Sequence, residues 1–356
     1  MKFDKVVGTG GVGTGMLLLS PIQDTLGRSE SRLVHMSPAR DYCKLHIVFH
    51  YIAALIGKQT EVYPLSYVGQ DTMGEELLGE MRLAGMHTEY MGRSEELRTM
   101  LSVCLQYPDK EGCNMTVINS AASRVTPEYI RSSMEALSVD ANTLVAAIPE
   151  VSAESRIALL REGKERGAFC VLSVPAAEAE TFLEADAFTL CDLLAVNEEE
   201  ARAVLSAMDK EREGDTQESF GDELVLRLYE QVERLNPEIQ LLVTFGKHGA
   251  YTMAGRRLEY LPAAQVSVKN TTGAGDAFLG GTITGLCLGL PLQKSSSESA
   301  LEETELLSAA ELGTFCAGLA VQCEDSIAWE TEPGILDGIG ISCTDIKTGR
   351  NKDTLQ

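Results

Sequence analysis

Strand-like and helix-like segments alternate regularly over the second half of the chain. From residue 143 onward, each short apolar run is followed by a longer segment with apolar residues at helical spacing. The predicted strands are 143–148, 169–174, 193–196 and 240–244, and the predicted helices between them are 153–166, 176–185, 198–208 and 223–235. This order is typical of an α/β fold with a mostly parallel sheet covered by helices on both faces.

The remaining segments are shorter and more mixed. We predict strands at 5–8, 16–22, 32–36, 61–68, 100–107, 114–118 and 266–268, and helices at 43–56, within 68–86, at 126–137 and at 306–323. The polar segments 209–222 and 294–304 are expected to be surface loops, and 344–356 a polar tail. We expect residues 1–343 to form one domain.

Composition limits the possible partners. Apolar residues make up 44% of the chain and the formal net charge is −23, so we expect a globular protein that nucleic acid and anionic membranes repel. The nine cysteines show no C-x-x-C spacing, and the N-terminus has no apolar signal segment. The longest weakly polar stretch, 277–292, is too short and too rich in glycine to span a membrane. These features favour a cytoplasmic protein with reduced thiols.

The segment 266–281, VSVKNTTGAGDAFLGG, combines an anion site with a possible base. Gly273 and Gly275 allow a tight turn before a predicted helix, and the first N–H groups of that helix, those of Gly273, Ala274 and Gly275, would surround an anion. Asp276 lies in the same turn, where its carboxylate could take a proton from an attacking hydroxyl. A capped glycine turn is the simpler interpretation of this motif alone, but phosphoryl transfer explains it together with the motifs upstream.

Two further motifs follow predicted parallel strands. Asn197 and Glu200 stand after strand 193–196 as N-x-x-E, where they either cap a helix or hold a water of phosphate-bound Mg²⁺. Thr244, Gly246 and Gly249 form T-x-G-x-x-G after strand 240–244, a spacing that suits either a tight turn or a phosphate-binding loop. Because ligands bind at the carboxyl ends of parallel strands, we expect these motifs to meet in one crevice.

Together, T-G-A-G-D at 272–276, N-x-x-E at 197–200 and T-x-G-x-x-G at 244–249 resemble the ribokinase-like (PfkB) family of carbohydrate and nucleoside kinases. The resemblance is densest over 61–328. It implies a three-layer α/β/α sandwich with a small β lid, whose strands lie within 9–40 and 97–120. It further implies transfer of the γ-phosphoryl of ATP to a sugar hydroxyl, with Asp276 as general base and the 273–275 backbone as anion hole.

The same resemblance implies roles for other residues and for the lid. The nucleotide would contact Thr244, Gly246, Gly249, Thr271 and Thr272, while Asn197 and Glu200 would serve Mg²⁺. Lid strands of this family often mediate dimers, which makes a homodimer plausible. The monovalent-cation site of the family often uses an Asp where this chain has Asn270, so a K⁺ requirement is doubtful.

The acceptor-binding motifs depart from the family pattern. The family's N-x-D after the first strand corresponds to Gly11 and Gly13, and its G-G-x-G-x-N corresponds to the segment around 43–46. The candidate replacements are Arg28, Asp41, Lys44 and Glu150, with Glu30, Arg32 and His46 as further possibilities. Two arginines and a lysine beside the cleft would suit a negatively charged acceptor.

Three alternatives remain open. A nucleoside or vitamin-precursor kinase can share this fold, and a catalytically silent member can bind a sugar or nucleotide as a sensor. Gly8, Gly10 and Gly13 also match G-x-G-x-x-G, the fingerprint of a dinucleotide-binding oxidoreductase. That fingerprint requires a helix after the third glycine, and Pro21 interrupts the segment where the helix would continue.

Overall fold

An eight-stranded sheet forms the centre of the molecule. The computed structural model describes residues 1–109, 112–209, 221–294 and 308–339. The strand order is β14-β13-β12-β11-β10-β9-β1-β4, and the neighbours from β12 to β4 pair in parallel, whereas β13 and β14 pair antiparallel. The strands are β1 (Lys5–Thr9), β4 (Glu61–Leu65), β9 (Thr143–Ala147), β10 (Phe169–Ser173), β11 (Leu193–Asn197), β12 (Gln240–Thr244), β13 (Ala250–Ala254) and β14 (Arg257–Leu261).

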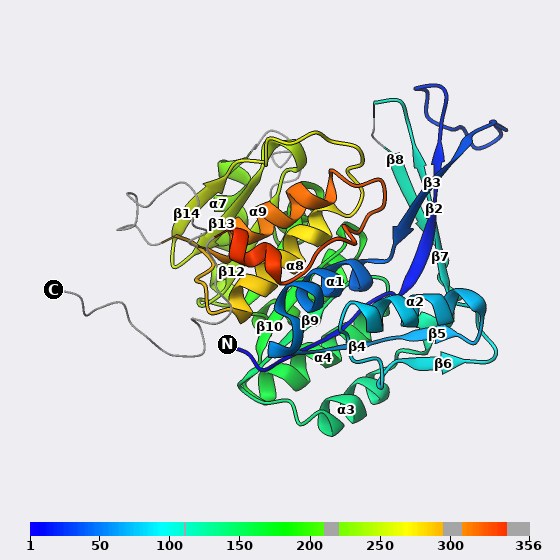
Figure 1. The fold of residues 1–356 in the computed structure, drawn as a ribbon. Coiled ribbons are helices and arrows are strands. Elements are labelled where there is room, and N and C mark those ends of the chain that lie inside the picture. The colour runs from blue at the N-terminus through cyan, green and yellow to red at the C-terminus, as the bar shows by residue number, and fades with distance from the viewer. Residues whose placement is uncertain (110–111, 210–220, 295–307, 340–356) are drawn as a thin grey trace.

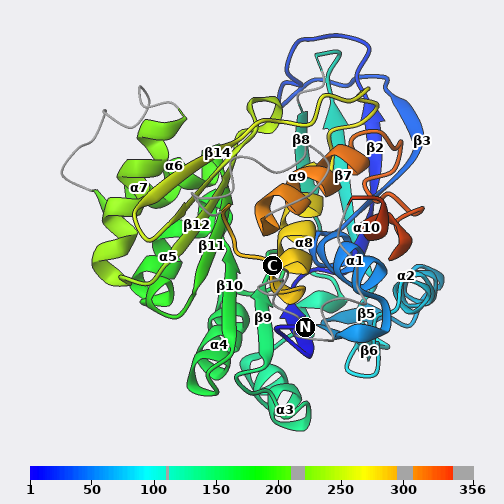
Figure 2. The ribbon, with the colours of Figure 1, turned by 60° about the vertical axis from the view of Figure 1, so that its left-hand side comes forward.

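Helices cover both faces of this sheet (Figures 1 and 2). One hydrophobic core joins the sheet to α1 (Lys44–Ile56), α2 (Thr72–Leu83), α8 (Ala274–Cys287), α9 (Ala309–Ala320) and α10 (Gly334–Gly338). A second core lies on the opposite face beneath α3 (Pro127–Ala136), α4 (Ala153–Glu165), α5 (Ala179–Glu184), α6 (Glu198–Met208) and α7 (Asp222–Leu235). Successive strand residues alternate between the two cores, so both faces of the sheet must be apolar.

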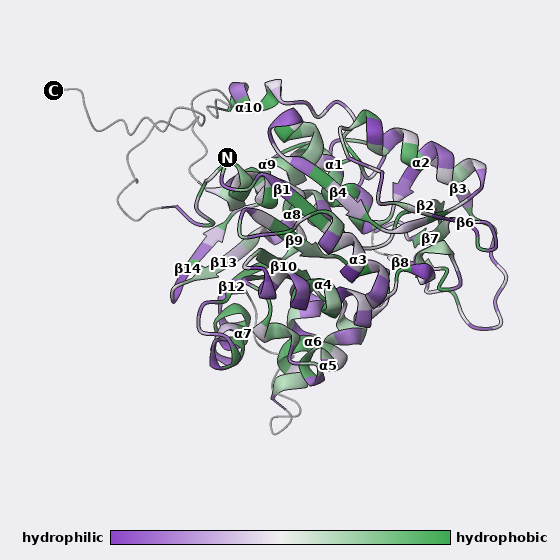
Figure 3. Ribbon diagram, turned by 90° about the horizontal axis from the view of Figure 1, so that it is seen from below, coloured by the Kyte–Doolittle hydropathy of each residue, from purple (hydrophilic) through white to green (hydrophobic). Residues whose placement is uncertain are grey.

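The apolar composition of the central strands follows from this arrangement. All five residues of β9 are buried, and Figure 3 shows this strand in the hydrophobic colour, with hydrophilic segments toward the sheet edge at β14. Such continuous apolar runs are typical of strands covered on both faces. The predicted three-layer α/β/α sandwich is therefore confirmed.

A second sheet of four strands stands out from the sandwich as the predicted lid (Figure 1). Its order is β3-β2-β7-β8, with β2 (Gly13–Leu19), β3 (His35–Tyr42), β7 (Met100–Gln106) and β8 (Gly112–Thr116). A short pair, β5 (Tyr67–Gly69) and β6 (Gly92–Ser94), lies near its base. Strand β2 begins earlier than the predicted strand 16–22 and includes Gly13 and Gly15. Position 13 has room only for glycine, because a Cβ there would lie 2.4 Å from the carbonyl oxygen of Met100 on the neighbouring strand β7.

One strand prediction was wrong and another was displaced: only residues 35 and 36 of the predicted strand 32–36 belong to β3, which runs on to Tyr42. Residues 266–268 form no strand, and this segment runs along the surface with Val268 57% exposed. The edge strand β14, with the sequence RLEYL, was not predicted. The chain also continues from Gly13 as a strand, so the dinucleotide fingerprint lacks the helix that it needs.

The remaining predictions agree with the structure or fall on residues that the structure does not describe. The predicted helices correspond to α1–α9 within a few residues, and the segment 176–185 is divided into a short 3₁₀ turn and α5. The predicted loops at 209–222 and 294–304 fall mostly outside the described residues, as does the whole 344–356 tail. Within the described ranges, no helix is long and apolar enough to cross a membrane.

Candidate active site

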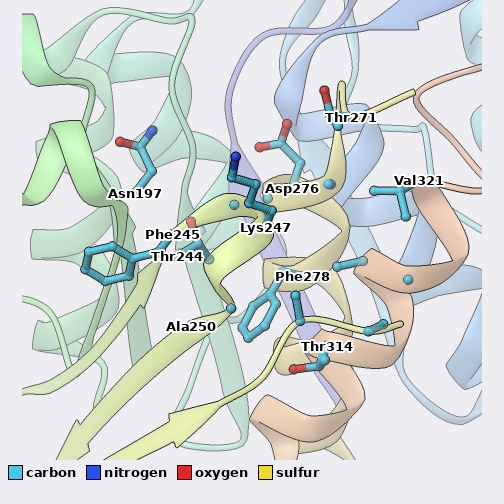
Figure 4. Close-up of a pocket in the computed structure, with 18 of the residues that line it drawn as sticks. Asn197, Thr244, Phe245, Lys247, Ala250, Thr271, Asp276, Phe278, Thr314 and Val321 are labelled. Carbon is cyan, nitrogen blue, oxygen red and sulfur yellow. The ribbon is translucent and has the colours of Figure 1, made fainter. Parts of the chain in front are cut away.

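Two cavities meet at the carboxyl ends of the parallel strands. The larger, about 930 Å³, lies between the ends of β11 and β12 and the helices α8 and α9 and is called here the cleft. The smaller, about 270 Å³, lies under the lid and is called here the lid cavity. Four residues line both cavities: Lys44, Thr271, Gly273 and Asp276. Figure 4 shows the cleft with Asn197, Thr244, Thr271 and Asp276 around it.

The N-terminus of α8 forms the wall between the two cavities. Gly273 is its N-cap with φ of 80°, a left-handed conformation that side chains disfavour, and a Cβ there would lie 2.5 Å from the carbonyl oxygen of Ser326. The Ala274 N–H reaches the Thr271 carbonyl at 3.3 Å, whereas a Cβ on Gly275 would meet open space. Because first-turn N–H groups lack intrahelical acceptors, this end of α8 suits an anion.

Asp276 forms an ion pair at this wall. Its Oδ1 accepts from Lys44 Nζ at 3.3 Å, and its side chain is 19% exposed. Burial raises the pKa of the Asp276 carboxyl, and the positive charge of Lys44 opposes that rise. The pKa of Lys44 is raised above its ordinary value, chiefly by the charge of Asp276 and further by those of Glu150 and Glu200. Lys44 therefore stays charged at neutral pH.

Glu150 reaches the lid cavity through an unusual backbone conformation. Its φ of 77° lies in the left-handed region, which is rare for residues other than glycine. The Glu150 carboxylate accepts from the Lys44 N–H at 2.9 Å, at the start of α1. Burial raises the pKa of Glu150 to about 7, although the charge of Lys44 acts to lower it. Glu150 thus changes charge near neutral pH.

Asp41 supplies another carboxylate to the lid cavity. It is buried on β3, where its Oδ1 accepts from the Tyr42 N–H at 2.9 Å and its Oδ2 accepts from Cys104 Sγ at 3.2 Å. The structure thus brings together Asp41, Lys44, Glu150 and Asp276 from three separate parts of the sequence.

The predicted arginines do not line this cavity. Arg28 lies in the exposed connection between β2 and β3 and lines neither cavity, because the connection extends beyond the ends of both lid strands. Arg32 is paired with Glu30 in the same connection. His46 is fully buried against the rings of Tyr42 and Trp329. Arg28 is therefore not placed to bind an acceptor in the lid cavity.

Asn197 and Glu200 begin α6 with a reciprocal capping box. The Asn197 side chain accepts from the Glu200 N–H at 2.9 Å, and the Glu200 carboxylate accepts from the Asn197 N–H at 2.8 Å. Both residues also line a recess that contains Lys44 and Asp276. Burial raises the pKa of Glu200, while Lys44 lowers it. Among the described residues, no group of three or more His, Cys, Asp or Glu could hold a metal by itself, so a Mg²⁺ held here would keep water and phosphate ligands.

The turn after β12 contributes the floor of the cleft. Gly246 and Gly249 have φ of 54° and 87°, and a Cβ on Gly249 would lie 2.2 Å from the Leu261 carbonyl oxygen. Thr244 lines the cleft with both glycines, as predicted for a nucleotide contact. Thr272 lines the lid cavity but not the cleft, and its N–H donates to Asn270 Oδ1 at 3.0 Å.

Several cleft residues were not predicted from the sequence. They come from the segment after β14 and from α9, and they are mostly apolar or small: Pro262, Ala263, Val266, Val268, Thr314, Ala317, Gly318 and Val321. The sequence signal for these residues was the run of small side chains in α9, which would let a ligand approach the helix closely. Such runs are equally common where helices pack against each other. These residues give the cleft an apolar wall facing its polar floor.

Comparison with known proteins connects this geometry to a family. The family described as "pfkB family carbohydrate kinase" matches residues 49–332. The ribokinase of Lactococcus lactis is 27% identical over 235 residues, which cover 66% of this chain and 69% of that protein. The ribokinase of Staphylococcus aureus is 24% identical, covering 64% of this chain and 69% of that protein.

Solved structures with low sequence identity share the fold. The ribokinase of Giardia lamblia has a TM-score of 0.74 at 18% identity and covers 94% of this chain and 98% of its own. The ribokinase of Cryptococcus neoformans, solved in complex with ADP, has a TM-score of 0.71 at 20% identity, with coverages of 94% and 99%. A nucleoside kinase of Burkholderia thailandensis, solved with inosine, has a TM-score of 0.66 at 17% identity, covering 96% of this chain and 97% of its own.

Proposed function

The chain belongs to the pfkB family of carbohydrate kinases, which are phosphotransferases with an alcohol group as acceptor, and we propose that it transfers the γ-phosphoryl group of ATP to a hydroxyl of a sugar or sugar derivative. The observation that carries this proposal is the position of Asp276. It lies at the N-terminus of α8, where the cleft and the lid cavity meet. A nucleotide in the cleft and an acceptor under the lid would therefore face each other across this residue.

The proposed reaction uses the groups at this junction. A carboxylate oxygen of Asp276 takes the proton of the acceptor hydroxyl, whose oxygen attacks the γ-phosphorus while the bond to the β-phosphate oxygen breaks and ADP leaves. The first N–H groups of α8 and the ammonium of Lys44 stabilise the negative charge on the transferred group. Mg²⁺ would neutralise phosphate charge, with Glu200 and Asn197 holding its waters.

The cleft is suited to the nucleotide. Its volume of about 930 Å³ lies in the ordinary range for cofactor sites, and Thr244, Gly246 and Gly249 offer a hydroxyl and open backbone. Thr271 would contact a phosphate, which is supported by its position in the lining of both cavities. The fold shared with a ribokinase solved in complex with ADP supports this assignment.

A sugar is favoured over a nucleoside by the size of the lid cavity. Its volume of about 270 Å³ is less than a third of that of the cleft. A nucleoside has roughly twice as many non-hydrogen atoms as a pentose, so it would require the lid to open further. A nucleoside or vitamin-precursor acceptor, or a silent sensor, is the alternative if sugars are not turned over.

We further propose a homodimer formed through the lid. Met16, Val103 and Met115 are aligned across β2, β7 and β8 and line neither cavity, so they lie on the outer face of the lid. Met36 on β3 is 71% exposed and Met115 is 62% exposed. An apolar sheet face of this kind is suited to pairing with a second copy.

The test of the kinase proposal is ADP release from ATP and Mg²⁺ with neutral sugars, amino sugars, sugar acids and nucleosides. Turnover of a sugar by the wild type, and its loss in Asp276→Asn, would support the kinase proposal. Nucleotide binding without turnover of any acceptor would instead favour the sensor.

A further inference from the structure

Another large cavity lies away from the active site. It lies between α1, α2 and the segment 325–333, and it is called here the α2 cavity. In the described part of the chain it shares only Tyr42 with the lid cavity and no lining residue with the cleft. We propose that the α2 cavity is a second binding site, for an uncharged ligand that carries an aromatic nitrogen heterocycle and hydroxyl groups, which is the chemistry of a nucleoside. This site does not depend on the proposed transfer reaction.

The size of the α2 cavity and its aromatic wall suit such a ligand. Its volume of about 840 Å³ lies in the ordinary range for small-molecule sites. Trp329 is 38% exposed, and the centre of its ring lies 4.9 Å from that of His50 and 5.4 Å from that of Tyr42. Asp325 Oδ2 accepts from Trp329 Nε1 at 3.3 Å, which holds the indole in place. A large ring that is fixed and partly exposed at a cavity can stack against a planar heterocycle.

His50 brings unused hydrogen-bonding groups to this cavity. It lines the α2 cavity and is only 3% exposed, yet neither of its ring nitrogens forms a hydrogen bond within the described residues. Burial lowers the pKa of His50 to about 4, although the backbone of Ala328 acts to raise it. The ring is therefore neutral at neutral pH and offers one donor and one acceptor.

Glu80 adds a buried acceptor to the same cavity. Its Oε1 accepts from Arg40 Nη1 at 2.6 Å, whereas its Oε2 is buried and forms no hydrogen bond within the described residues. Buried polar atoms in proteins nearly always have partners. The unused atoms of His50 and Glu80 thus point to a ligand that brings both donors and acceptors, as the ring nitrogens and the amino or amide groups of a nucleobase do.

The charges around the α2 cavity disfavour an anionic ligand. Four carboxylates line it against two permanent cations, which leaves a net formal charge of −2: Glu61, Glu80, Asp325 and Glu332 against Arg40 and Lys58. The guanidinium of Arg40 is already paired with Glu80 and Glu76. A phosphate group would be repelled here, whereas hydroxyl groups can donate to the carboxylate oxygens. These charges favour a nucleoside over a nucleotide.

Trp329 provides a direct measurement of binding, because it is the only tryptophan of the chain. Its fluorescence is titrated with adenosine, uridine and AMP while saturating ADP and Mg²⁺ occupy the cleft, and equilibrium dialysis under the same conditions gives the affinities. We expect at least one nucleoside to bind with a saturable change in fluorescence, and AMP to bind at least about tenfold more weakly than adenosine. Absence of binding by both nucleosides, or equal binding of AMP and adenosine, would overturn the proposal.

Two histidine variants locate the ligand. His46 and His50 are both buried on α1 with unpaired ring nitrogens and lie near Trp329, but only His50 lines the α2 cavity. His50→Phe keeps a ring of similar size and removes the nitrogens, so the Kd of the nucleoside should rise about fivefold, as expected for one lost hydrogen bond. His46→Phe is the control and should leave the Kd unchanged. Equal affinities in the two variants would contradict binding in this cavity.

Glu80→Gln gives a second test that does not depend on the packing of α1. The amide oxygen can still accept from Arg40, but an NH₂ group replaces the unpaired oxygen, so the Kd should again rise about fivefold. Wild-type affinity in both Glu80→Gln and His50→Phe would overturn the proposal. Failure of the chain to phosphorylate any acceptor would count against the kinase proposal and would leave these binding results unaffected.

Discussion

Lys44 Nζ lies 3.3 Å from Asp276 Oδ1, and both residues belong to the first turns of helices, Lys44 in α1 and Asp276 in α8. Two helix N-termini thus converge on the point where the two cavities meet. The positive ends of both helix dipoles and the Lys44 ammonium act on the same small volume. This arrangement favours a transferring phosphoryl group, on which negative charge must be stabilised.

Asp276→Asn should abolish most of the turnover while leaving nucleotide binding intact. The amide cannot take the proton of the acceptor hydroxyl, so we expect kcat to fall by roughly 10²–10⁴-fold. Equilibrium titration with ATP and Mg²⁺ should give a Kd close to that of the wild type. Near-normal turnover in this variant would remove Asp276 from the mechanism.

Lys44→Met should lower kcat and shift the pH dependence of the reaction. The charge of Lys44 lowers the pKa of Asp276, so its removal raises that pKa and the base is ionised only at higher pH. We expect kcat to fall about 10²-fold and the acidic limb of the kcat/KM profile to move to higher pH. Lys44→Arg, which retains the charge, is the control and should leave the limb near its original position. An unmoved limb in Lys44→Met would show that the ion pair does not tune the base.

Glu200→Gln separates a metal role from a structural one. Glutamine can still accept from the Asn197 N–H, so the capping box and the stability of α6 should survive, whereas the charge that would attract Mg²⁺ is lost. We expect the Mg²⁺ concentration for half-maximal activity to rise, with an unchanged melting temperature. Asn197→Ala should instead lower the free energy of unfolding by about 1 kcal/mol, because it removes the cap. An unchanged Mg²⁺ dependence in Glu200→Gln would leave Glu200 with its capping role alone.

Glu150 should make the protein less stable as the pH rises. Its pKa of about 7 in the folded state exceeds its ordinary value of 4.5, so the folded state binds more protons between these values and loses stability as pH increases through them. Glu150→Gln lacks this loss. Its free energy of unfolding relative to wild type should therefore grow between pH 5 and pH 8, by up to about 3 kcal/mol. Urea unfolding at both pH values measures the difference, and a pH-independent difference would mean that Glu150 titrates normally.

The fold was largely predictable because its signals are local. Buried parallel strands such as β9 appear as continuous apolar runs, and the helices between them show the expected spacing. The segment 266–268 has the same apolar character but forms no strand, since it instead provides an apolar wall of the cleft. Local pattern does not distinguish a residue that pairs in a sheet from one that faces a ligand.

The candidate site was predictable only where a motif marks it. Thr244 ends β12 and Asp276 lies in the first turn of α8, each within a recognisable motif, and the structure brings both to the cleft. Glu150 lines the lid cavity and Arg28 does not, and this difference depends on how parts of the chain that are far apart in the sequence meet in space. A lid connection carries Arg28 away from the cavity, and the absence of a side chain at Gly11 admits Glu150. The sequence alone therefore does not show which charged side chains line the lid cavity.

Charged substitutions on the outer face of the lid should dissociate the proposed homodimer. Met36→Glu combined with Met115→Glu would place two carboxylates from each copy in an apolar contact, and burying them unpaired is costly. We expect sedimentation velocity to show a dimer for the wild type and a monomer for the double variant. Leu83→Glu on α2 is the control, because Leu83 is 90% exposed but lies outside the lid, and this variant should remain dimeric. A wild type that stays monomeric at high micromolar concentration, or a dimer that persists in the double variant, would contradict pairing through this face.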